Sequence, residues 1–249
     1  MRTEEYVSAL SERIQNEEGL LAFRVGTPLG VDVSGDAVFS QTKVHPFTVR
    51  NTCVTGLRRT SFIRRTIIAL SCLYEKSEAN FLVISPRQEY GELLRLRSLD
   101  ITVPFIRTRQ DLQDAFACVK GVLETQANMQ GVPKLFLVLD GLEEIPDCNA
   151  NGDLEEYRNF FELSARSKNI EILCGAELMK SIFSGNPGVF AGVGNCIVTT
   201  REDGVADVTY VRDDSSLSTP TAMRYPDSPS ITESVIFLNA LPSRPSEGV

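Results

Sequence analysis

The sequence lacks the features that mark a membrane-spanning protein or a metal site. No apolar run approaches the roughly 20 residues that a membrane-spanning helix needs, and the N-terminus is amphipathic and acidic rather than signal-like. The 6 cysteines are scattered without a C-x-x-C pair. The single histidine, His45, has no cysteine close by in sequence with which to share a metal. We therefore expect no metal, and a reducing, cytoplasmic compartment in which the cysteines act as small hydrophobic residues.

Positive charge is also scarce. The 249 residues include 25 Lys and Arg against 33 Asp and Glu, which gives a formal net charge of −8. A chain this acidic lacks the overall attraction to phosphate that draws proteins onto nucleic acid regardless of sequence. The composition therefore predicts no nucleic-acid partner.

Hydrophobic periodicity favours an α/β domain over residues 19–212. Strands are predicted as a hairpin around residues 34–35 and near residues 46–54, 81–85, 101–106, 134–140, 170–174 and 195–199. Helices are predicted over residues 62–73 and 108–123 and around residues 154–165 and 177–183. This alternation favours a mostly parallel central sheet with helices on both faces. Outside the domain, residues 1–18 predict an N-terminal helix or linker. Residues 213–249 predict a Pro/Ser-rich arm with one strand-like segment at 235–239.

One segment, RNTCVTGLRRTSFIRRTII, has the layout of a phosphate-binding loop without most of its chemistry. A working loop reads G-x-x-x-x-G-K-[ST], where glycines let backbone N–H groups surround the phosphates and the lysine reaches the outer oxygens. On this frame Cys53 and Arg58 replace the two glycines, and Arg59 replaces the lysine. Gly56 and Thr60 match. Any nucleotide would therefore be held by Gly56, Arg59 and Thr60.

The most apolar predicted strand, KLFLVLD, ends in a carboxylate at Asp140. In a motor ATPase such an aspartate holds Mg²⁺, and a glutamate that follows it polarises the attacking water. Asp140 fits the first role. The residue after it is Gly141, so Glu143 is the candidate for the second role. A carboxylate three residues after the aspartate points in a different direction from one directly next to it. The other interpretation of Asp-Gly-Leu-Glu-Glu is a solvated turn between a strand and a helix.

Arginines form the densest basic cluster of this acidic chain at Arg58, Arg59, Arg64 and Arg65. Arg59 could bind phosphate in place of lysine, although its planar guanidinium is bulkier. Arg58 would fill the space that glycine leaves for a phosphate. The interpretation favoured by these side chains is that Arg58, Arg64 and Arg65 bind acidic groups on a partner or on another part of this chain.

In their order along the chain, these segments resemble a domain of the FtsK/SpoIIIE-type motor family of P-loop ATPases. The matching segments are VGVDVSGDAVFSQ, PFTVRNTCVTGLRRTSF, VISPRQEYGEL with Ser85 in place of an acid, LFLVLDGLEEI and ARSKNIEILCGAEL. The resemblance covers about residues 26–211 and implies a RecA-like P-loop fold. Within the family, the chain most resembles the degenerate C-terminal ATPase module of type VII secretion ATPases, the EssC/EccC class.

That resemblance implies a role in substrate recognition or in regulation of neighbouring FtsK-like modules, with little or no ATPase activity. Small WXG-type secreted proteins would be the cargo. The module would work in the cytoplasm at the inner face of the membrane, which it would meet only through other parts of the machine. No cofactor is expected under this interpretation. Two alternatives remain open: a divergent Mg-ATPase that uses Arg59, Thr60 and Asp140 on Mg-ATP, and a component of a DNA translocase.

Overall fold

A single mixed sheet organises the described part of the chain. The structure is a computed structural model that describes residues 28–32, 37–39, 51–71, 74, 77–96, 100–104, 106–128, 132–146, 159, 162, 169–175, 195–210 and 217–225. The strands are β1 (Pro28–Asp32), β2 (Ala37–Phe39), β3 (Asn51–Thr55), β4 (Ala79–Ile84), β5 (Asp100–Thr102), β6 (Lys134–Leu139), β7 (Ile170–Gly175), β8 (Asn195–Thr200), β9 (Val205–Tyr210) and β10 (Thr221–Arg224). The helices of the described part include α3 (Arg59–Ser71) and α4 (Arg109–Asn128), with 3₁₀ helices η1 (Gln88–Arg95) and η2 (Leu142–Glu144).

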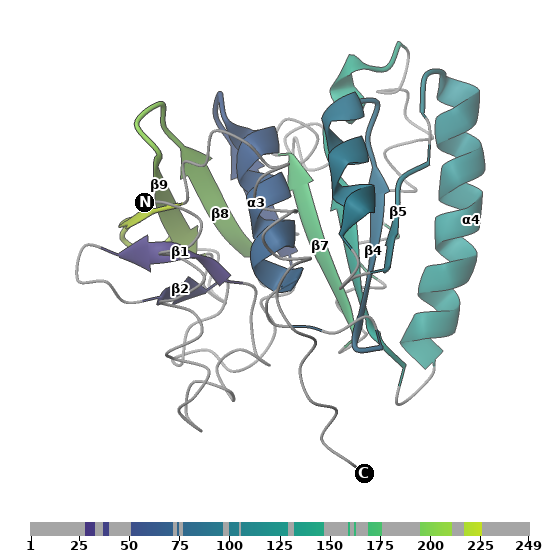
Figure 1. Ribbon diagram of the computed structural model, residues 1–249, viewed down its shortest axis with the longest axis horizontal. Helices are drawn as coiled ribbons and strands as arrows, with labels where there is room; N and C mark the ends of the chain where they lie inside the picture. Colours follow the sequence, from purple (N-terminus) through teal and green to yellow (C-terminus); the bar gives the residue numbers. More distant parts are fainter. Residues whose placement is uncertain are drawn as a thin grey trace.

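The sheet has a parallel half and an antiparallel half (Figure 1). Its 10 strands lie in the order β2-β1-β10-β9-β8-β3-β7-β6-β4-β5. From β8 to β5 every neighbouring pair is parallel, whereas β9, β10, β1 and β2 add antiparallel pairs at the other end. The chain leaves β3 for β4 on one side and later returns to β8 on the other, so the strand order reverses at β3. In open α/β sheets, ligands bind outside the carboxyl ends of strands at such a reversal.

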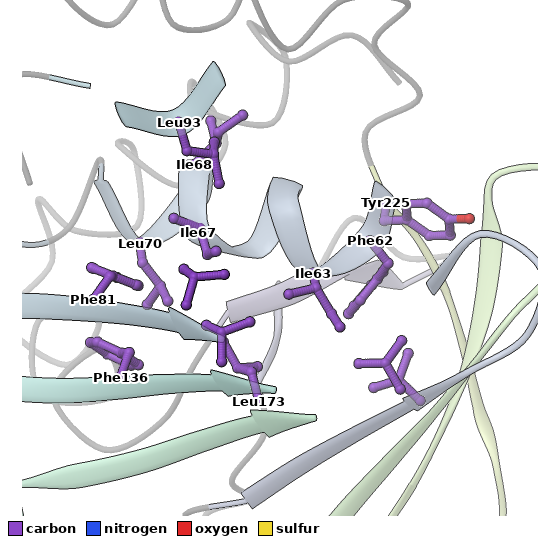
Figure 2. Close-up of a cluster of buried hydrophobic side chains, with 14 of the residues drawn as sticks. Phe62, Ile63, Ile67, Ile68, Leu70, Phe81, Leu93, Phe136, Leu173 and Tyr225 are labelled. Atoms are coloured by element: carbon purple, nitrogen blue, oxygen red, sulfur yellow. The ribbon is translucent and has the colours of Figure 1, made fainter. Parts of the chain in front are cut away.

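Helices cover both faces of the parallel strands. Successive strand residues point to opposite faces, so β6 contributes Phe136 and Val138 to one core and Leu135 and Leu137 to another. The α3 helix packs on the first core, and Figure 2 shows its Ile67 and Leu70 side chains on the side of the strands that carry Phe81 and Phe136, with Ile68 beside Leu93. The α4 helix supplies buried apolar side chains to the second core, namely Leu112, Phe116, Val119 and Leu123. The predicted α/β fold with a mostly parallel sheet covered on both faces is confirmed.

The α4 helix begins with a cap formed by Thr108 and Asp111. Thr108 Oγ1 accepts a hydrogen bond from the Asp111 backbone N–H at 3.1 Å, and an Asp111 carboxylate oxygen accepts one from the Thr108 N–H at 2.8 Å. These reciprocal bonds satisfy donors that the first helical turn leaves unpaired. Bonds from the Arg107 and Thr108 backbone N–H groups lower the pKa of the Asp111 carboxyl.

The sheet includes a strand beyond residue 212, within the segment predicted as a C-terminal arm. The β10 strand, Thr221–Arg224, lies inside the sheet, where it pairs with both β9 and β1. The pair with β1 joins segments far apart in sequence, so local composition could not reveal it. The predicted hairpin around residues 34–35 is confirmed by the antiparallel β1 and β2 pair.

Several predicted elements fall outside the described residues. These are the helix at 1–18, the helix at 177–183, the strand at 235–239 and, apart from residues 159 and 162, the helix at 154–165. Among the helices that the structure describes, none combines the length and the apolar character needed to cross a membrane.

Candidate functional site

The site lies where the N-terminus of α3 meets the carboxyl end of β6. The β3 strand ends at Thr55, and only Gly56, Leu57 and Arg58 connect it to α3. Gly56 has φ +101°, and a Cβ at this position would lie 2.3 Å from the Thr200 backbone oxygen. Glycine is thus required here by the backbone conformation and by its close approach to the end of β8. The outcome is a tight connection that turns Arg59 directly into the first helical position.

This connection is shorter than the phosphate-binding frame predicts. Cys53, which the frame places at the first loop glycine, lies within β3, is 1% exposed and pairs in register with Cys174 and Ile197. The Arg59 backbone N–H also bonds to the Gly56 oxygen at 3.3 Å, closing the turn on itself. Only the segment from Gly56 onward therefore forms the connection, and the first half of the expected loop is strand.

Asp140 is the centre of the site, and both of its carboxylate oxygens accept hydrogen bonds from protein groups. Arg59 Nε donates to Oδ1 at 2.9 Å, in an ion pair whose side chains are 9% and 0% exposed. Thr60 Oγ1 and the Tyr90 hydroxyl donate to Oδ2 at 2.6 and 2.9 Å. Gly175, at the end of β7, lies next to this pair: a Cβ there would meet Arg59 Nε and Asp140 Oδ1 at 3.4 Å, an ordinary van der Waals contact. The structure thus brings together the predicted residues Arg59, Thr60 and Asp140.

Tyr90 is a site residue that the sequence analysis missed. It lies in η1, is buried, and is 50 residues from Asp140 in sequence. Burial, and then the negative charge of Asp140, raise the pKa of its hydroxyl well above the usual value. Tyr90 therefore stays protonated and acts as a donor at neutral pH. No local pattern around η1 distinguishes this tyrosine from a core aromatic residue.

Arg87 is a second residue that the sequence did not identify as part of the site. Its Nη1 donates to Thr60 Oγ1, and its Nη2 donates to Glu144 Oε1. Its side chain crosses Gly141, which has φ +72°, and a Cβ at Gly141 would lie 2.7 Å from Arg87 Nε. The glycine that follows Asp140 is therefore explained by its left-handed backbone and by the guanidinium packed over it.

Glu143 and Glu144 lie in η2, directly after this glycine. Glu143 Oε1 accepts a hydrogen bond from Arg59 Nη2, so this carboxylate pairs with the arginine that stands in place of the lysine. Within the residues that the structure describes, Glu143 Oε2 and Arg87 Nε are buried atoms without a hydrogen-bond partner. The network at the site is therefore dense but incompletely satisfied, which is unusual for buried polar atoms.

The arginines predicted to bind a partner have different environments. Arg64, on α3, forms an ion pair with Glu92 of η1 at 2.5 Å, so it binds another part of this chain. Arg58 lies half-buried in the connection before α3, and Arg65 lies half-buried on α3. A role for Arg58, Arg64 and Arg65 in binding a partner stays a prediction.

The site combines two guanidinium groups, from Arg59 and Arg87, with the carboxylates of Asp140, Glu143 and Glu144. In a working P-loop ATPase, Mg²⁺ contacts the loop hydroxyl and the aspartate, and the lysine contacts phosphate. The equivalent groups here are Thr60 Oγ1, the Asp140 carboxylate and Arg59, and each of them contacts another protein side chain. Among the described residues, no group of three or more His, Cys, Asp or Glu is arranged to hold a metal ion.

No protein-family model and no curated protein matches this sequence, but solved structures do. The cytoplasmic domain of the Thermomonospora curvata type VII secretion ATPase EccC matches with a TM-score of 0.61 and 12% identity, over 82% of this chain and 28% of that one. EccC ATPases 2 and 3 from the same organism, in complex with a signal sequence peptide, match with a TM-score of 0.54 and 14% identity, over 81% and 41%. EssC ATPases 2 and 3 from Geobacillus thermodenitrificans match with a TM-score of 0.51 and 11% identity, over 86% and 49%.

This chain spans less than half the length of each of those three chains. At identities of 11% to 14%, the likeness shows the fold and not the activity. The FtsK-like P-loop fold predicted from the sequence is thus confirmed, and the chain has the fold of the ATPase domains of the type VII secretion proteins EccC and EssC.

Proposed function

We propose that this chain is a catalytically degenerate FtsK-like module of a type VII secretion motor, which recognises substrate or regulates neighbouring modules without turning over ATP. The observation that carries the proposal is the Asp140 carboxylate, both of whose oxygens accept bonds from Arg59, Thr60 and Tyr90. A carboxylate used in this way supports the structure of the site rather than the binding of a magnesium ion.

The energetics favour this interpretation. Binding Mg-ATP would require Arg59 to leave Asp140, which is 0% exposed at its side chain. Mg²⁺ would then have to take the place of Arg59 at Asp140, and phosphate the place of Asp140 at Arg59. Nucleotide binding would therefore have to replace existing protein contacts before any net affinity appeared. The short connection from Gly56 to Arg58 also offers fewer backbone N–H groups to phosphates than a complete loop does.

The proposed partners are neighbouring ATPase modules of the motor and a peptide signal on WXG-type secreted proteins. EccC ATPases 2 and 3 form a complex with a signal sequence peptide, which supports peptide recognition as a use of this fold. The module would act in the cytoplasm, at the inner face of the membrane to which other parts of the machine are attached. The net charge of −8 disfavours the alternative of a DNA translocase component.

Calorimetry on the purified chain tests the proposal. We expect no heat from Mg-ATP at millimolar concentration and measurable binding, in the absence of nucleotide, of a synthetic signal peptide from a WXG-type protein. The same peptide with its residues in scrambled order serves as the control. Micromolar binding of Mg-ATP that disappears in Arg59→Ala would overturn the proposal.

A second candidate is a divergent Mg-ATPase, and the convergence of Arg59, Thr60 and Asp140 in one site favours it. In that case Mg-dependent release of phosphate from ATP would be measurable. The release would be lost in Asp140→Ala and retained in Glu92→Ala, because Glu92 pairs with Arg64 outside the site.

A further inference from the structure

The inference concerns what the side chains of Glu143 and Arg87 replace, and it rests on the proposed function. We propose that these two side chains form an internal substitute for a magnesium–phosphate ligand, and that Arg59 is a latent binding residue for polyphosphate anions that Glu143 keeps covered. The site is then a closed nucleotide pocket whose ligand has been replaced by the protein's own charges, rather than one whose binding residues have been lost.

Glu143 takes the place of the anion. Arg59 stands at the lysine position of the phosphate-binding frame, and two of its three guanidinium nitrogens face different carboxylates: Nε donates to Asp140 and Nη2 donates to Glu143. Asp140 directly follows the central strand β6, whereas Glu143 reaches Arg59 from η2, the turn that comes next. A carboxylate and a phosphate present similar oxygens to a guanidinium, so Glu143 Oε1 occupies a contact that a phosphate oxygen would make.

Arg87 takes the place of the cation. Thr60 Oγ1 is the hydroxyl that would bind Mg²⁺, and it accepts a hydrogen bond from Arg87 Nη1 while donating to Asp140. The positively charged guanidinium of Arg87 therefore contacts the same Thr60 hydroxyl that the metal would contact. Gly141 makes this geometry attainable, because any Cβ there would collide with Arg87 Nε. The glutamate that follows the aspartate in a working motor could not occupy this position while Arg87 crosses it.

The internal substitute fits the site incompletely, which makes it displaceable. Glu143 uses one carboxylate oxygen on Arg59, while its Oε2 is buried and, in the described part of the chain, has no partner. Arg87 Nε is likewise buried without a hydrogen-bond partner among the described residues. The side chains of Glu143 and Arg87 are 23% and 25% exposed, whereas that of Arg59 is 9% exposed. Truncating Glu143 should therefore uncover Arg59 and leave the fold intact.

The test uses inorganic tripolyphosphate as the probe, at low salt and without Mg²⁺, with the whole chain and the variant Glu143→Ala. Calorimetry should detect no binding to the unaltered protein and binding at least about tenfold tighter to Glu143→Ala. The variant lacks the Glu143 carboxylate, which carries a negative charge like the probe and competes with it for Arg59. Glu92→Ala is the matched control: it removes the same charge and also breaks an arginine pair, that of Arg64, outside the site. It should bind no more tightly than the unaltered protein.

A second measurement locates the anion. In ¹H–¹⁵N spectra of the arginine Nε groups, tripolyphosphate should shift the Arg59 resonance, assigned through Arg59→Lys, in Glu143→Ala and not in Glu92→Ala. Shifts at other arginines without Arg59 would overturn the inference, as would a failure of folded Glu143→Ala to bind. Either result would leave the proposed function standing. Equal, tight binding to the unaltered protein would instead overturn both, because the site would already be open.

Discussion

Arg87 passes so close to Gly141 that a Cβ built on the glycine would lie 2.7 Å from Arg87 Nε. This contact, together with the φ of +72° at Gly141, means that a side chain after Asp140 would strain the backbone and displace the Arg87 side chain. It also links two separate features, the missing glutamate after the aspartate and the arginine that precedes η1.

Left-handed backbone strain alone should make Gly141→Ala destabilise the fold by about 1–3 kcal/mol. The collision with Arg87 should add to that loss. Urea unfolding measures this change. In the double variant Gly141→Ala/Arg87→Ala the collision disappears and the backbone strain remains, so the two effects should not add. As a control, Gly121→Ala in α4, where a Cβ meets nothing within 4 Å, should stabilise by about 0.5–1 kcal/mol. Additive losses at positions 141 and 87 would contradict the contact.

Arg59→Ala should lower the free energy of unfolding by about 3–5 kcal/mol, because it leaves the buried Asp140 charge without its cation. Arg59→Lys keeps a positive charge near Asp140 and should lose less. The exposed pair of Arg201 and Asp207 gives the comparison: Arg201→Ala should cost no more than about 1 kcal/mol. If Arg59→Ala unfolds at the same urea concentration as the unaltered chain, Arg59 does not support the fold in the way its contacts indicate.

Tyr90→Phe should cost about 1.5–3 kcal/mol, since it removes a buried hydroxyl that donates to a charged carboxylate. Tyr225→Phe is a suitable reference, because Tyr225 is equally buried but its hydroxyl donates to a neutral backbone oxygen, that of Arg201, at 3.3 Å. That reference change should cost about 0.5–1.5 kcal/mol. Denaturation of the two variants at neutral pH measures the difference, and a larger loss in Tyr225→Phe would show that Tyr90 contributes little to the site.

Stability should fall as the pH rises into the alkaline range. Burial raises the pKa of the Cys174 and Cys196 thiols well above their ordinary value of 9.0, and burial raises that of Tyr90 well above 10.0. Above those ordinary values the unfolded chain loses protons that the folded chain retains, so unfolding is favoured. Each such group should contribute a slope of about 1.4 kcal/mol per pH unit, beginning near pH 9 for the thiols and near pH 10 for Tyr90.

Urea midpoints under reducing conditions, between about pH 8 and about pH 11, measure this profile. Tyr90→Phe should lessen the slope above about pH 10. Cys196→Ala should lessen it from about pH 9 onward. A flat profile over the whole range would show that these groups ionise as readily in the folded protein as in the unfolded chain.

Much of the fold was predictable because it depends on local periodicity. Apolar residues at strand and helix spacing located β4, β6, β7, β8, α3 and α4 to within a few residues. Strand β10 was missed because its four residues belong to the sheet only through pairs with β9 and β1.

The sequence by itself determined the α/β class, the order of the segments, and the presence of Arg59, Thr60 and Asp140 at the ends of elements that the fold would bring together. Tertiary structure alone decided how those groups are used. Tyr90 and Arg87 reach the site from η1 and from its N-terminal side, and they contact residues 50 and 27 positions away in sequence. Arg59 turns inward to Asp140 and Glu143 because a buried charge is costly unless it is paired with an opposite charge. Residue spacing in the sequence does not encode this pairing.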